Sequence, residues 1–316
     1  MYIIIYMYII LLFFSLFFQV ECTYIYSSVS DWEYLGMHSV ENKVSTENID
    51  LDSIANEEWL FLRSKFPCIP TSPKINIKFD TGISDTRILA YASANLHLNS
   101  NGVWVSQLFE AYLQNRNSSM SFFSDITIRV NPTVPNGWFV ASSPDAPCDD
   151  ISYRFCLRTV LRHEILHGFG FASSIKQKNG VWSVGYNFQN DPSLCYPYLY
   201  DTMIRDEYNN SIITGCNITD ISNKKLFIND VPLYNPSSYK EGSSISHHDI
   251  QNNLMYFSLP AQQCLNIGEY EEKVLQELGV MCNGNTTKNN TDKNNGATKK
   301  FNLFQTSLII IILFLF

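Results

Sequence analysis

The chain has 316 residues, with 22 basic and 30 acidic side chains, a formal net charge of −8 and an apolar share of 45%. This composition is typical of a chain that folds, and it excludes an intrinsically disordered protein. The basic residues are few and scattered, which excludes nucleic acid as a partner class.

The N-terminal segment predicts export. Residues 1–18 are apolar or aromatic except for Ser15, and small residues stand three and one positions before a cut ahead of Thr23. Residues 1–22 are therefore expected to be a signal peptide. An uncleaved anchor is the alternative, because eighteen helical residues reach about 27 Å, nearly the thickness of a bilayer core. Residues 23–66 show no clear periodicity and are expected to be a pro-segment or an N-terminal wrap.

Residues 67–282 are expected to form the folded domain, with an α+β pattern. Alternating apolar residues predict strands, and apolar residues at helical spacing predict helices. In chain order we expect a strand at 75–79, a helix at 103–114, strands at 126–130 and 137–142, a helix at about 151–169 and a last helix at 267–279.

The helix at 151–169 contains a His-Glu-x-x-His motif, His163-Glu164-Ile165-Leu166-His167. Residues four apart share one helix face, so both imidazoles can bind the same Zn²⁺, one ion per chain. Glu164 lies beside them, where it can act as general base towards a metal-activated water. Gly168 and Gly170 are expected to end the helix through positive φ angles.

Hydrolytic zinc sites normally have three protein ligands, so a third is required. The short metzincin pattern has its last histidine where this chain has Ser173. His38 and His97 lie in segments expected to be wrap and loop, which leaves the adjacent pair His247 and His248. Neighbouring side chains usually point apart, so only one of the two is expected to face the metal; either His247 or His248 could be that ligand. A glutamate ligand from the last helix is less favoured, since its carboxylates are expected on the solvated face: Glu269, Glu271, Glu272 and Glu277.

The segment HEILHGFGF, the long insertion after it, the Ser-His dipeptide and the Leu254-Met255 pair resemble the leishmanolysin-like branch of the metzincin zinc peptidases. The resemblance covers about residues 74–281. It implies a twisted mixed sheet with two helices over an active-site cleft, and a mostly irregular lower subdomain with a C-terminal helix. It also implies His247 as third ligand and Met255 in a turn beneath the metal.

The implied activity is that of a zinc endopeptidase acting on protein or peptide substrates. Tyr256 is a candidate oxyanion stabiliser, with a core tyrosine as the alternative, and residues 200–206 are expected to support the site. A surface adhesion or wall protein that keeps zinc only as a structural clamp is the competing hypothesis; His248 as a fourth ligand would favour it.

Eight cysteines in an exported chain predict disulfides, and cleavage after Cys22 leaves seven of them. Closeness in sequence favours Cys148 with Cys156, Cys195 with Cys216 and Cys264 with Cys282, and it leaves Cys68. The Cys68 thiolate is an alternative cap for the zinc in a latent form, although a disulfide is favoured.

The C-terminal end predicts a lipid anchor. Residues 283–295 are expected to be a glycosylated stalk, and residues 296–316 a removed glycosylphosphatidylinositol signal with attachment at Asn295, because small residues, a polar spacer and a short apolar tail follow one another there. The protein is therefore expected on the extracellular face of the plasma membrane or in the cell wall, held to the membrane by the lipid. The N-glycosylation triplets begin at Asn117, Asn209, Asn217, Asn285 and Asn289.

Overall fold

The computed structural model describes residues 49–66, 73–99, 102–109, 124–148, 152–185, 195–215 and 217–280, all within a unit that extends from Met1 to Cys282. The expected signal peptide, stalk, lipid-attachment site and glycosylation sites Asn117, Asn285 and Asn289 lie outside these residues. The described part is a mixed α+β fold with small sheets and few helices, which confirms the expected class at that level. None of its helices has both the length and the apolar character needed to cross a bilayer.

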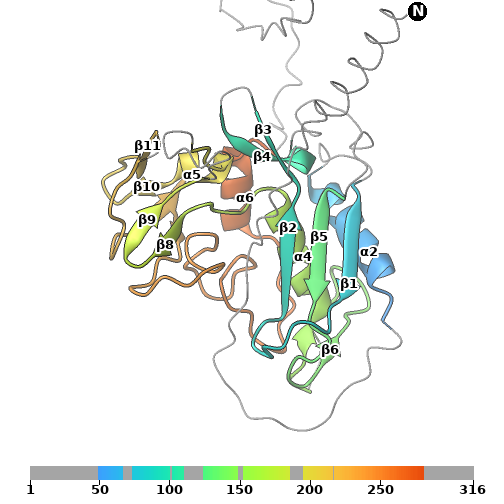
Figure 1. The fold of residues 1–316 in the computed structure, drawn as a ribbon. Helices are drawn as coiled ribbons and strands as arrows, with labels where there is room; N and C mark the ends of the chain where they lie inside the picture. The colour runs from blue at the N-terminus through green and yellow to red at the C-terminus, as the bar shows by residue number, and fades with distance from the viewer. Residues whose placement is uncertain are drawn as a thin grey trace, which may run out of the picture. The chain divides into compact units, whose positions relative to one another are not determined.

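A mixed three-stranded sheet supports the N-terminal half (Figure 1). Its central strand β5 (Ile126–Val130) runs parallel to β1 (Ile75–Phe79) and antiparallel to β2 (Ala90–Ala94). Both strands predicted for this region are thereby confirmed. Alternate residues of β5 are buried, because side chains on a strand point in turn to opposite faces of the sheet.

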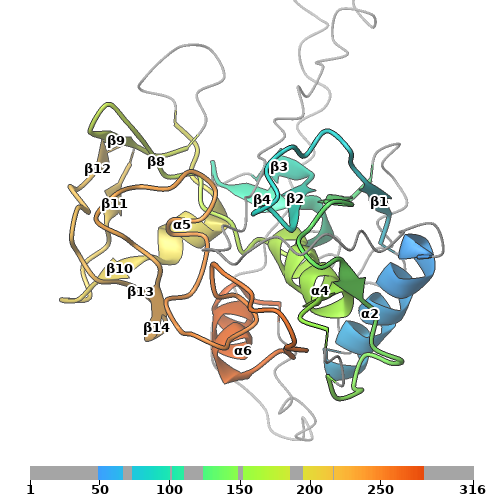
Figure 2. The same ribbon diagram turned by 90° about the horizontal axis from the view of Figure 1, so that it is seen from below.

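Two helices cover one side of this sheet, as Figures 1 and 2 show: α4 (Leu157–Gly168) and α2 (Leu51–Lys65). Helix α4 packs against β2, β5 and α2, and all twelve of its residues are buried. The Trp59 ring of α2 stacks on Phe169 at the end of α4, with ring centroids 5.4 Å apart. Helix α2 was not expected within the segment 23–66, and it packs against both α4 and β1.

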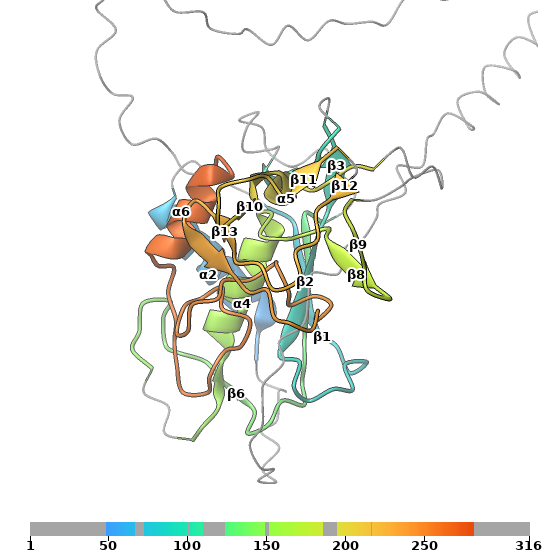
Figure 3. The same ribbon diagram turned by 90° about the vertical axis from the view of Figure 1, so that its left-hand side faces the viewer.

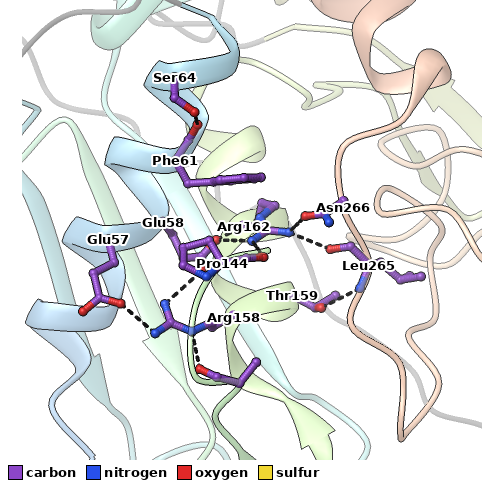
Figure 4. Close-up of polar contacts among 11 residues, drawn as sticks. Glu57, Glu58, Phe61, Ser64, Pro144, Arg158, Thr159, Arg162, Leu265 and Asn266 are labelled. Carbon is purple, nitrogen blue, oxygen red and sulfur yellow. Dashed lines mark hydrogen bonds and ion pairs between the residues drawn. The ribbon is translucent and has the colours of Figure 1, made fainter. Parts of the chain in front are cut away.

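A buried ion cluster joins α2 to α4 (Figure 4). The Glu58 carboxylate lies 3.1 Å from Arg158 Nη1 and 2.6 Å from Arg162 Nη2, and all three side chains are buried. Burial raises the pKa of Glu58, while both guanidinium groups lower it. Arg162 also donates to the backbone oxygens of Pro144 and Leu265, so this one side chain ties two loops to α4.

Glu58→Ala is expected to lower the free energy of unfolding by about 3 kcal/mol, because it leaves two buried guanidinium groups without their shared carboxylate. Urea denaturation measures this loss. Glu57→Ala is the matched control: Glu57 also binds Arg158, at 2.6 Å, but its side chain is 46% exposed. Its loss should be about 0.5 kcal/mol. Equal losses from the two variants would show that burial of the Glu58 pair contributes nothing.

The C-terminal half contains short strands, long loops and two helices (Figures 1 and 3). Its three-stranded antiparallel sheet has the order β10-β13-β14, and α6 packs against β14. The last predicted helix is confirmed as α6 (Glu269–Glu277). The remaining elements are β3 (Leu96–Leu98), β4 (Trp104–Ser106), β6 (Trp138–Phe139), β7 (Phe155–Cys156), β8 (Lys176–Lys178), β9 (Val181–Ser183), α5 (Leu199–Met203), β10 (Arg205–Asp206), β11 (Ile213–Thr214), β12 (Asn217–Ile218), β13 (Leu226–Ile228) and β14 (Val231–Leu233).

Three predicted elements differ from the structure. The strand expected at 137–142 is limited to the two residues of β6, Trp138–Phe139. The helix expected at 103–114 is wrong at its start, where Trp104–Ser106 forms β4 and pairs with β3; the backbone pairing outweighs the helical spacing of the side chains. Residues 110–114 lie outside the described part. The helix expected at about 151–169 begins only at Leu157, because Phe155 and Cys156 pair in parallel with β6.

Two of the three predicted disulfides are wrong. Cys148, Cys156 and Cys264 are free thiols, so neither Cys148–Cys156 nor Cys264–Cys282 is a disulfide in this structure. A short separation in the sequence does not determine which cysteines the fold brings within bonding distance. Cys195 is disulfide-bonded as expected, but its expected partner Cys216, like Cys68 and Cys282, lies outside the described residues.

Candidate metal centre

Helix α4 presents the two motif histidines together, as its periodicity requires. His163 and His167 are fully buried, and their ring centroids lie 4.5 Å apart. Glu164, also fully buried, follows His163 directly on the same helix. The helix ends just beyond this motif, at Gly168.

The two glycines after the motif have different functions. A Cβ atom at Gly168 would lie 2.2 Å from Ile126 Cδ1, so glycine is required for the close contact between α4 and β5. Gly170 has a φ of +110°, which confirms the prediction that it turns the chain away from the helix. The prediction of a positive φ for Gly168 is wrong, because that residue is still helical.

His247 completes a group of three. It reaches the motif from the loop before the Met255 segment, and its ring centroid lies 5.2 Å from that of His163 and 5.0 Å from that of His167. One potential ligand atom from each of the three residues lies within 4.8 Å of the others. Among the described residues, these side chains form the one group of this kind. Three buried imidazoles therefore converge on a volume that a metal ion could occupy.

Each imidazole is oriented through its Nδ1 atom. His163 Nδ1 lies 2.7 Å from the Leu254 oxygen, His167 Nδ1 2.5 Å from the Phe171 oxygen, and His247 Nδ1 2.8 Å from the Ser243 oxygen. A carbonyl oxygen only accepts, so each Nδ1 carries the hydrogen and each Nε2 carries the lone pair. Metal-binding histidines are commonly fixed in this tautomer by such contacts.

The three rings are neutral at physiological pH. Burial lowers the pKa of His167 to about 4, and burial followed by neighbouring imidazoles lowers the pKa of His163 and His247 well below the ordinary value. A protonated imidazole cannot bind a metal, whereas a neutral one can. The donor set therefore fits a borderline ion such as Zn²⁺, which binds imidazole nitrogen readily.

His248 faces the opposite way. Its Nδ1 atom lies 3.7 Å from Glu271 Oε1 on α6, and its ring packs against Phe171 with centroids 5.7 Å apart. Burial lowers the pKa of His248 to about 3, so its ring is neutral too. Of the two adjacent histidines, His247 is the one that joins the motif histidines in the group that could hold a metal.

The segment with Met255 contacts the site through its backbone. Leu254 accepts the His163 hydrogen bond, and the next residue, Met255, is fully buried. The Met255 N–H donates to Glu271 Oε1 at 3.0 Å, so α6 anchors this turn. Glu271 is therefore buried and structural, which corrects its expected place on a solvated helix face. Tyr256 is half-buried beside Phe257, with ring centroids 4.5 Å apart; its role as oxyanion stabiliser stays a prediction.

Other predicted residues are placed as follows. Asn209 and Asn217 are exposed, as glycosylation requires. Of the remaining candidate ligands on α6, Glu269, Glu272 and Glu277 take no part in the metal-binding group found among the described residues. His38 and the side chain of His97 lie outside that part of the chain.

Asp201, a residue without an individual role in the sequence prediction, is fully buried and accepts hydrogen bonds from Ser173, Ser174 and Tyr198. Burial raises the pKa of Asp201 to about 6, against these hydrogen bonds. It lies in the segment 200–206, which was expected to support the site. The one signal in the sequence was an acidic residue in a largely apolar segment. The hydrogen-bond donors that Asp201 binds could not be recognised, because they come from other parts of the chain.

Comparison of the chain with protein-family models, with curated proteins and with solved structures finds no match. The functional interpretation therefore depends on the residues of the site itself.

Proposed function

We propose that the protein is a zinc-dependent endopeptidase of the leishmanolysin-like metzincin type. The observation that carries this proposal is the convergence of three buried, neutral imidazoles, with the Glu164 carboxylate beside them on the same helix. Three protein ligands are typical of hydrolytic zinc sites, whereas structural sites usually have four. The structural-clamp alternative is not favoured, because His248 lies against Glu271 instead.

His163, His167 and His247 would hold the ion. When bound, Zn²⁺ supplies a Lewis acid that lowers the pKa of a water molecule and polarises a peptide carbonyl. Glu164 accepts the proton of the attacking water and then transfers it to the amine that leaves. Tyr256 is proposed to donate its hydroxyl hydrogen to the carbonyl oxygen as negative charge develops there.

Removal of the metal tests this function. The purified protein is expected to hydrolyse a denatured protein substrate, to lose this activity after dialysis against a chelator and to recover it on addition of one equivalent of Zn²⁺. Mg²⁺ is the control ion, because it prefers oxygen ligands and should restore nothing. Hydrolysis that continues unchanged in the metal-free protein would contradict the proposal.

We further propose that the enzyme is exported and held by a glycosylphosphatidylinositol anchor at Asn295, on the basis of the two ends of the sequence. A phospholipase specific for phosphatidylinositol is expected to release the protein from intact cells into the medium. Protein that stays with the membranes until detergent is added would contradict the lipid anchor and favour an uncleaved N-terminal anchor.

A further inference from the structure

The loop that delivers His247 is held under backbone strain. Ile245, two residues before the histidine, has a φ of +73° and is fully buried. A β-branched residue is a genuine outlier in this left-handed region, at a cost of about 1–3 kcal/mol. Such a conformation persists only where the surrounding structure imposes it, so contacts with neighbouring segments must hold this loop in place.

Two sets of contacts hold the loop from outside. The Tyr200 hydroxyl on α5 donates to the Ile245 oxygen at 3.2 Å, and the Ile245 N–H donates to the Tyr234 oxygen at 2.7 Å. On the next residue, the Ser246 hydroxyl accepts from the Ser173 N–H at 3.1 Å. Ser246 directly precedes His247, so this hydrogen bond lies one residue away from the third imidazole.

Ser173 is itself anchored. Its hydroxyl donates to Asp201 Oδ1 at 2.6 Å and accepts from the Ile175 N–H at 3.1 Å. Asp201 also accepts from the N–H groups of Ser174 and Tyr198, each at 3.0 Å. The Ser173 N–H therefore joins the chain that leaves α4 directly to the loop that carries His247, and the buried Asp201 carboxylate holds Ser173 in place for this bond.

We propose that Asp201, Ser173 and Ser246 are positioning residues that hold His247 in its metal-binding orientation; we call these three residues the serine latch. Ser173 occupies the position at which the short metzincin pattern has its third histidine. In this chain the position supplies no ligand itself, but it binds the residue next to the ligand that comes from the distant loop. The inference rests on the metal site of the proposed function.

Zinc affinity of the full chain tests the latch, measured by competition with a chromophoric chelator. Ser246→Ala is expected to weaken zinc binding by about ten-fold, the lower end of the usual effect of residues that orient metal ligands. Ser244→Ala is the matched control. Ser244 is a buried serine of the same loop, and its hydroxyl accepts one backbone hydrogen bond, from Lys240. Its zinc affinity should equal that of the parent.

The melting temperature of the metal-free protein separates positioning from general stability. Both variants lose one partly buried hydrogen bond and should melt at similarly lowered temperatures, so only the latch predicts a difference in zinc affinity. Ser173→Ala, which removes the hydroxyl bound to Asp201, provides a second variant if Ser246→Ala does not fold, and its zinc binding should also be weaker than that of the parent. Parent-like affinity in every folded latch variant would overturn the inference, whereas a parent chain that binds no zinc would overturn the proposed function instead.

Discussion

Glu164→Gln is expected to bind one Zn²⁺ per chain like the parent and to hydrolyse a denatured protein about 10²–10⁴-fold more slowly. Glutamine has nearly the shape of glutamate and fits the same fully buried position beside His163, so the three imidazoles keep their places. What it lacks is a carboxylate that can take a proton from water. The loss should therefore fall on kcat, since proton transfer belongs to the transition state.

The measurement combines metal analysis of the purified variant with initial rates at saturating substrate. Glu272→Gln is the control, because it makes the same chemical change at an exposed position of α6. It should leave both zinc content and rate as they are in the parent. Parent-like turnover by the Glu164 variant would show that another group acts as the base.

The second prediction separates the two adjacent histidines. His247→Ala is expected to abolish stoichiometric zinc binding, because it removes one of the three converging imidazoles. His248→Ala should still bind one zinc, because His248 faces Glu271 and lies outside the group. Both residues are fully buried, so both substitutions leave a cavity and lower stability.

Thermal unfolding with and without zinc distinguishes loss of the ligand from loss of packing. Zinc at a hundred times its dissociation constant stabilises a binding-competent fold by about 2.7 kcal/mol. The His248 variant should show this rise in melting temperature, and the His247 variant should show none. The reverse outcome would assign the third ligand to His248 and would contradict the geometry described above.

The residues of α4 could be predicted from sequence because the information is local. A helix places His163 and His167 on one face whatever surrounds it, and Gly170 ends the helix through its own conformational freedom. The strands at 75–79 and 126–130 were predicted for the same reason, since apolar and polar side chains alternate within five residues in each of them. The rule that neighbouring side chains point apart required only that one of His247 and His248 face the metal, and the resemblance of the Ser-His dipeptide to the leishmanolysin-like branch selected His247.

The interactions between distant segments could not be predicted. The apolar stripe of helix α2 is interrupted by Glu58, a charged residue on its buried face that is balanced by arginines about a hundred residues later. Trp104 occurs in a helical pattern, but its strand is determined by pairing with β3. Glu271 was expected in solvent because its role depends on an N–H group in another loop. The local sequence pattern of a segment does not identify the distant residues that it contacts.

The close contact at Gly168 links the geometry of the candidate metal site to the packing of the hydrophobic core. Because glycine has no side chain, the motif helix packs directly on Ile126 at Gly168, one residue after His167 of the candidate metal site. Any bulk added between helix and sheet would lift His167 away from His247, which is fixed by a different loop. The packing distance between α4 and the sheet thus sets the position of His167 relative to His247, so the apolar contacts beneath α4 belong to the geometry of the candidate site as much as the imidazoles do.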